Sequence, residues 1–98
     1  MNLNKLMKQA QKMQEQMAKT QAELESKTVE ISTGGGKVKV TANGAGDVLS
    51  IKIDKEIVDP EDVEFLEEMV LSAVKQAVEQ GKGLAQSEMS KITGGLGF

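Results

Sequence analysis

The 98-residue sequence contains no cysteine, histidine, tryptophan, tyrosine or arginine, and its two aromatic residues are Phe65 and Phe98. Without cysteine there is no disulfide scaffold, no thiol nucleophile and no thiolate zinc site. Without histidine the commonest general base is missing, and without arginine there is no bidentate phosphate clamp. We therefore expect a protein that is not an enzyme and that uses no cofactor, metal ion or small-molecule substrate.

Long apolar runs are also missing. No segment approaches the ~20 consecutive apolar residues that span a bilayer, and no apolar signal core follows Met1. Hydrophobic residues make up 39% of the chain and charged residues 28%, which is typical of a folded rather than a disordered protein. The length suits a single domain. We expect one domain, residues 1–98, in the cytoplasm and without a membrane partner.

Charge is unevenly distributed along the chain. Residues 1–22 hold four lysines and one glutamate, whereas residues 56–80 hold one lysine and eight acidic residues. The net charge of −3 argues against a protein coated with nucleic acid. It is compatible with one basic arm held away from an acidic body.

The first segment, residues 1–26, is predicted to form a helical arm. It lacks glycine and proline, and good helix formers dominate it. A helix of this length measures ~37 Å, too long for one small core to cover, so part of it should project or pair with another helix. Its apolar residues repeat with heptad spacing and form a seam, namely Leu3, Leu6, Ala10, Met13, Met17, Thr20 and Leu24.

Residues 27–54 change to a period of two, which predicts three half-buried strands. Glycine-rich turn signals at residues 34–36 and 43–46 separate them, so an antiparallel meander is expected. The alternating apolar residues are Val29 and Ile31, then Val38, Val40 and Ala42, then Leu49, Ile51 and Ile53.

A second helical region is predicted over residues 59–92. Asp59 suits the N-cap and Pro60 the first helical position. Gly81 and Gly83 interrupt the apolar face, so a kink near Gly81 is expected. Residues 93–98 are predicted to form a flexible tail. The fold class is therefore α+β, and the open sheet edges together with the seam of the first helix predict a homodimer.

Two other patterns that could suggest a ligand site have ordinary structural explanations. The run from Gly34 to Lys37 lacks the spacing and the following helix of a nucleotide-binding loop, and a hairpin turn explains it. The acidic residues between 61 and 68 suit the start of a helix, where the dipole favours negative charge.

The lysines of the first helix are the most informative pattern. With Leu3 at heptad position a, Lys5, Lys12 and Lys19 fall at c and Lys8 at f, all opposite the seam. Glutamines, including Gln9, fill most of the remaining surface. A face of one sign suits a polyanion, with phosphate contacts, weak sequence preference and strong salt dependence. A solvated coiled-coil face is the main alternative from this pattern alone, and a protein-interaction adaptor that uses the Met-rich seam is another.

Several segments, in matching order, resemble the YbaB/EbfC family of bacterial nucleoid-associated proteins. They are residues 6–14 (LMKQAQKMQ), 34–41 (GGGKVKVT), 43–44 (NG), 48–54 (VLSIKID), 58–64 (VDPEDVE), 66–67 (LE) and 91–96 (KITGGL).

The resemblance implies a small α/β protein whose homodimer projects helices like the arms of tweezers. It implies binding of double-stranded DNA in the nucleoid, with roles in nucleoid organisation and gene regulation, and no catalysis. From the charge map, we assign the DNA contacts to Lys5, Lys8, Gln9, Lys12 and Lys19.

Overall fold

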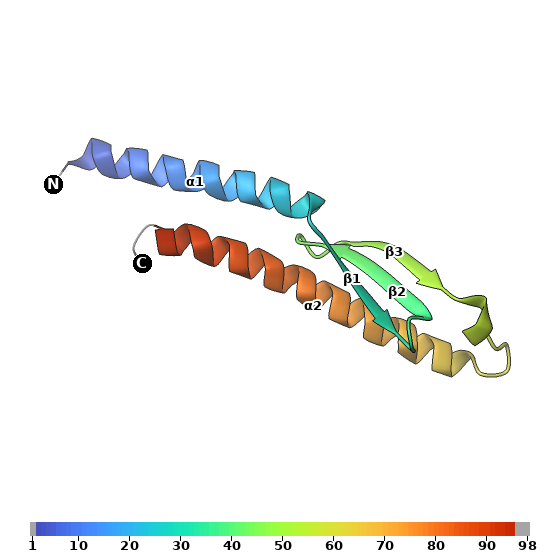
Figure 1. Ribbon diagram of the computed structural model, residues 1–98. Coiled ribbons are helices and arrows are strands. Elements are labelled where there is room, and N and C mark those ends of the chain that lie inside the picture. The colour runs from blue at the N-terminus through green and yellow to red at the C-terminus, as the bar shows by residue number, and fades with distance from the viewer. Residues whose placement is uncertain (1, 96–98) are drawn as a thin grey trace.

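The chain folds as a helix, a three-stranded sheet and a second helix, which confirms the predicted α+β order. The computed structural model describes residues 2–95 (Figure 1). A short 3-10 turn joins the sheet to the second helix. The elements are α1 (Leu3–Ser26), β1 (Thr28–Thr33), β2 (Val38–Asn43), β3 (Val48–Ile53), η1 (Lys55–Ile57) and α2 (Val63–Gly95).

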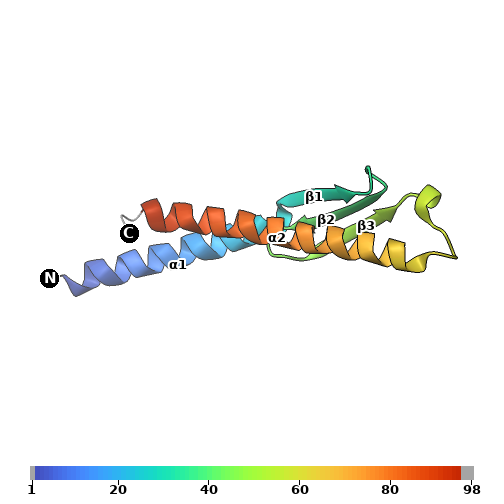
Figure 2. The same ribbon diagram turned by 90° about the horizontal axis from the view of Figure 1, so that it is seen from below.

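The molecule is strongly elongated. Its principal extents are 70 × 19 × 17 Å and its radius of gyration is 19.3 Å, whereas a compact chain of this length has a radius of about 13 Å. The cause is visible in Figures 1 and 2: α1 and the C-terminal half of α2 run side by side beyond the end of the sheet. The expected projecting arm is therefore a pair of helices rather than α1 alone.

The sheet is the predicted antiparallel meander, with strand order β1-β2-β3. Val40 pairs with Ile31 on one side and with Ile51 on the other, so these three side chains share a face. The β1–β2 turn contains Gly34, Gly35 and Gly36 with φ of 61°, 68° and 86°. This left-handed conformation favours glycine, which explains the triple-glycine run without a bound phosphate.

The core lies between α2 and the first two strands. Val38, Val40 and Ala42 of β2 are fully buried against Ala73 and Ala77 of α2. Alanine at the crossing lets the helix approach the sheet closely. Because α2 covers β1 and β2, all six residues of β3 remain exposed in the single chain, including Ile51 and Ile53. The prediction of a half-buried third strand is therefore wrong for an isolated chain.

The start of α2 differs from the prediction. The helix begins at Val63, and Asp59 does not cap it. Instead the Asp59 carboxylate accepts a hydrogen bond from the Glu61 backbone N–H at 2.9 Å and forms a turn. Asp62 then accepts from the Phe65 N–H at 3.4 Å, as a capping residue does.

The other end of α2 extends further than expected. α2 passes through Gly81 and Gly83 as one continuous helix, so these glycines do not end it (Figure 1). It ends at Gly95, so residues 93–95 of the predicted tail belong to the helix. The rest of that tail, residues 96–98, lies outside the described residues.

Candidate nucleic-acid interface

The apolar seam of α1 is buried at one end and exposed at the other. Leu24, at the base of the arm, is 3% exposed, while Met13 and Met17 are half-buried beside α2. Leu3, near the tip, is 68% exposed. The half of the seam nearer the base therefore packs within the chain. Leu3, Leu6 and Ala10 near the tip stay exposed in the single chain and remain open to a partner helix, as a protein-interaction adaptor would need.

The five residues predicted to contact DNA all lie on α1 and are all exposed, namely Lys5, Lys8, Gln9, Lys12 and Lys19. At 1.5 Å per residue, Lys5, Lys8 and Lys12 fall within about 10 Å of helix axis, and Lys19 lies about 10 Å nearer the base. Heptad positions c and f place the lysines away from the seam. The structure therefore brings the predicted residues together along one side of a rod.

The arm lysines differ from other lysines in their ion pairing. Ion pairs in the described part of the chain involve Lys27, Lys37 and Lys91, and none involves Lys5, Lys8, Lys12 or Lys19. Glu15, the acidic residue nearest to Lys12 in the sequence, makes no ion pair with it there. The four arm charges are therefore available to an external anion.

The lysines that do form ion pairs shift the pKa values of the groups involved. Lys37 Nζ lies 2.6 Å from Glu56 Oε2 and 3.5 Å from Asp54 Oδ2, and these contacts raise the pKa of Lys37. The backbone N–H of Glu56 and, more weakly, Lys37 lower the pKa of Asp54. Lys27 and Lys91 both lie 3.4 Å from Glu88 Oε1 and lower the pKa of that carboxyl. Lys37 therefore stays protonated, and its positive charge is balanced by two carboxylates, unlike the charges of the arm lysines.

The sheet carries a second, smaller group of lysines. Lys39 and Lys52 are directly opposite each other on β2 and β3, and both are exposed. Like charges in this position are mildly destabilising. Their alternation with Val38 and Val40 places them on the face of the sheet that α2 leaves bare. This pair is the strongest competitor to the arm as an anion site.

Two hollows were not foreseen from the sequence. One, of about 420 Å³, lies between β3 and α2 and is almost wholly apolar. It is lined by Ile53, Leu66, Glu67, Val70, Leu71 and Val74. The alternating pattern of β3 did signal an apolar face there, but the pattern alone does not tell which strands the helix covers.

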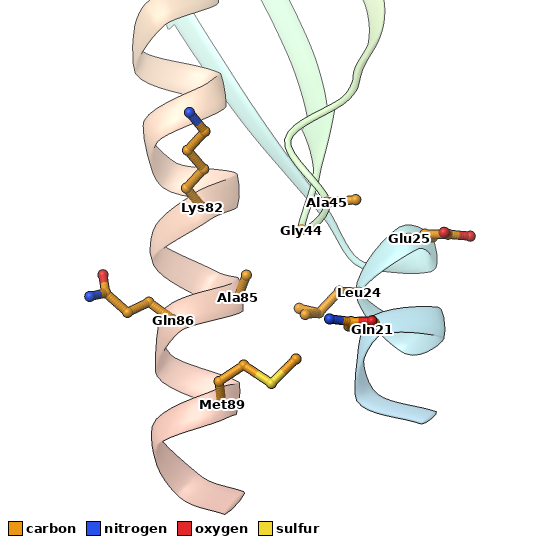
Figure 3. A pocket seen from close by; sticks show the side chains of 9 residues that line it. All are labelled: Gln21, Leu24, Glu25, Gly44, Ala45, Lys82, Ala85, Gln86 and Met89. Carbon is orange, nitrogen blue, oxygen red and sulfur yellow. The ribbon is translucent and has the colours of Figure 1, made fainter. Parts of the chain in front are cut away.

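The other hollow is a cleft of about 490 Å³ between the two helices at the base of the arm. Figure 3 shows Leu24 and Gln21 of α1 pointing towards Ala85 and Met89 of α2, with the turn at Gly44 closing one end. Its lining is more apolar than polar, and the polar side chains include Lys82, Gln21 and Gln86.

Other kinds of site were searched for across residues 2–95. Neither helix in that range has an apolar stretch long enough to cross a membrane. The same residues contain no group of three or more acidic side chains placed to hold a metal ion.

Comparisons with known proteins agree with this architecture. A crystal structure of protein HP0035 from Helicobacter pylori superposes with a TM-score of 0.83, covering 95% of this chain and 98% of that one. The two sequences are 19% identical, so this likeness concerns the fold.

Sequence relatives are closer. A nucleoid-associated protein of Ruminiclostridium cellulolyticum is 55% identical over 98% of this chain and 84% of the relative. A nucleoid-associated protein of Clostridium novyi is 53% identical over the same shares. The model of the YbaB/EbfC DNA-binding family, which is not an enzyme family, matches residues 1–96. The chain belongs to the YbaB/EbfC DNA-binding family.

Proposed function

We propose that this protein binds double-stranded DNA in the bacterial nucleoid through the exposed lysines of α1. The observation that carries the proposal is the row of Lys5, Lys8, Lys12 and Lys19, which lack ion pairs in the described chain and face away from α2. Lysines meet phosphates as point charges, and exposed Gln9 adds a neutral donor. Since phosphates are the same at every base pair, sequence preference is weak.

The arm geometry suits a rod lying along a duplex. α1 has 24 residues and is therefore about 36 Å long. Its lysines are concentrated towards the tip, at the greatest distance from the acidic residues that open α2. Because charges more than about 8–10 Å apart in salt solution are largely screened, the acidic body does not cancel the field of the tip.

A second copy of the chain supplies the other arm. β3 is an edge strand with unpaired backbone groups, and beside it lies the apolar hollow between β3 and α2. Ile51, Ile53 and Leu71 are 45%, 39% and 54% exposed in the single chain. An isologous contact through this edge covers both copies at once. The resulting homodimer presents two lysine-faced arms that grip one duplex between them.

Binding of this kind supports nucleoid organisation in the cytoplasm and, through competition for DNA sites, an effect on gene expression. Both roles follow from occupancy of DNA rather than from chemistry on it. The relatives from Ruminiclostridium cellulolyticum and Clostridium novyi, which are named nucleoid-associated proteins, support this assignment.

The test is a charge-reversal pair of equal size. The variant Lys5→Glu, Lys8→Glu, Lys12→Glu changes the arm, and Lys39→Glu, Lys52→Glu, Lys75→Glu makes the same change of net charge on the body. We expect the arm variant to lose binding to a labelled 30-base-pair duplex, with circular dichroism and mass in solution unchanged. The body variant should retain most of its affinity.

The opposite result would move the site. If the arm variant binds normally and the body variant does not, the DNA surface is the exposed face of the sheet around Lys39 and Lys52. If neither the parent protein nor either variant binds DNA at low salt, the adaptor hypothesis replaces DNA binding.

A further inference from the structure

Asn43, the last residue of β2, is a polar residue that is buried, with 4% exposure. Its amide nitrogen donates to the carbonyl oxygen of Glu25 at 3.2 Å and to Asp47 Oδ2 at 3.3 Å. Its amide oxygen accepts from the backbone N–H groups of Ala45 at 3.0 Å and Asp47 at 2.9 Å. An amide side chain can supply two donors and two acceptor positions, and here all four are used.

The same turn completes the end of α1. The last carbonyl groups of a helix lack partners within it and must find them elsewhere. The Gly44 N–H donates to the carbonyl oxygens of Leu24 at 2.9 Å and Lys27 at 3.0 Å. The Asn43 side-chain amide donates to the carbonyl oxygen of Glu25. The base of the arm is therefore hydrogen-bonded directly to the β2–β3 turn.

The turn is also fitted closely between the two helices. A Cβ atom on Gly44 would lie 2.6 Å from Leu24 Cδ2 and 2.9 Å from the Leu24 carbonyl oxygen. A Cβ atom on Gly81 of α2 would overlap the carbonyl oxygen of Asn43. Neither glycine has a positive φ, so each is required for space rather than for backbone conformation. Gly81, where the sequence suggests a kink, is a point of close approach to Asn43.

Next to this contact the two helices are less closely packed. The cleft of about 490 Å³ begins at Gly44 and Ala45 and opens between Leu24 and Met89 (Figure 3). The turn is therefore a tight contact beside a loosely filled space, and the direction of α1 at its base depends on the turn. A rotation of about 10° at the base of a ~36 Å helix moves the tip by about 6 Å.

We infer that Asn43, Gly44 and Gly81 form a positioning joint that sets the direction of α1 and with it the placement of the lysine face on DNA. The inference rests on the proposed function for its second half. These residues touch no DNA; they act through the arm. A displaced tip moves three lysines off the phosphates while leaving their charge unchanged.

The test measures arm direction and DNA affinity in the same variants. Because the chain has no cysteine, cysteines introduced at exposed Gln11 and Glu79 take spin labels cleanly, and dilution with unlabelled protein isolates the distance within one copy. Gly44→Ala inserts a methyl group at the joint. Gly83→Ala is the control, since nothing lies within 4 Å of its Cβ position.

We expect Gly44→Ala to shift the label distance by several ångströms and to weaken DNA binding at least tenfold, with helix content and mass unchanged. Gly83→Ala should change neither distance nor affinity. If Gly44→Ala fails to fold, Asn43→Asp replaces it, because a carboxylate keeps the shape but cannot donate to Glu25. An unchanged distance, or a shifted distance with full affinity, overturns the inference. A parent protein that binds no DNA overturns the proposed function instead, and the distances then judge the joint alone.

Discussion

The two ends of α1 differ although one apolar repeat runs through both. At the base, Leu24 is 3% exposed and Glu23 and Glu25 flank it; at the tip, Leu3 is 68% exposed and Lys5 and Lys8 follow it. The base lies against the β2–β3 turn and α2, whereas the tip extends past the sheet (Figure 1). A heptad seam indicates that a helix packs against a partner, but only the burial along the seam shows how far that packing extends. Positive charge is concentrated where that support is weakest.

The largest difference in stability should separate the two ends of this seam. Leu24→Ala removes a buried side chain and should cost about 2–5 kcal/mol in the free energy of unfolding. Leu3→Ala, which removes the same atoms from an exposed position, should cost less than about 0.5 kcal/mol. Urea denaturation of the two variants measures both values. Equal costs would mean that the tip is as well supported as the base, and the comparison would fail.

The next effect concerns the body rather than the arm. Ile53→Asp places a charge in the apolar hollow beside β3 and should weaken the proposed homodimer about 100-fold, which is ~2.7 kcal/mol. Ser50→Asp makes the same charge change on the same strand and should have a much smaller effect, because its pairing with Thr41 places it on the opposite face. Sedimentation equilibrium distinguishes the two. If both variants remain dimeric, the interface does not lie at β3 and is expected between the arms.

The smallest effect should come from the ion pair at the base of the arm. Glu88 lies between Lys27 and Lys91, which hold its pKa below the usual 4.5. A carboxyl with a lowered folded-state pKa contributes stability above its unfolded pKa and loses it as the pH falls through the folded value. Glu88→Gln should therefore lower the melting temperature slightly at pH 7.

The same pair of proteins gives the control in acid. Once the pH falls well below 4.5, the carboxylate is protonated and the melting temperatures of the parent protein and Glu88→Gln should converge. A difference that persists unchanged in acid would show that Glu88 contributes through packing rather than charge. Glu88 is half-buried, but its partners Lys27 and Lys91 are 45% and 72% exposed, so solvent weakens the pairs and a small difference is expected even at neutral pH.

Much of the fold was predictable because the periodicity of the sequence changes sharply between its segments. The seam of α1 and the alternation around Val40 gave the helix and the meander. The start of α2 was not predictable, since Asp59 and Asp62 are both good caps and hydrogen bonds outside the helix decide between them. The exposure of β3 depends on where α2 crosses the sheet, which no local pattern records.

The joint was the least visible part of the sequence. Asn43 and Gly44 read as an ordinary turn, and Gly81 as a helix-weakening residue. Their roles become visible in the structure, where the Asn43 amide donates to the carbonyl oxygen of Glu25, 18 residues away in the sequence. The lysine row, by contrast, needed only helical spacing, and its exposure follows from its position opposite the seam.

The most direct test of the central claim, that unpaired arm lysines hold the DNA backbone, is the affinity of the parent protein for duplex DNA at a series of salt concentrations. The two arms of the proposed homodimer carry eight lysines, and if about six meet phosphates the plot of log affinity against log salt should have a slope near −5. A slope near zero would contradict the account, because binding that releases no counterions is not binding to phosphates.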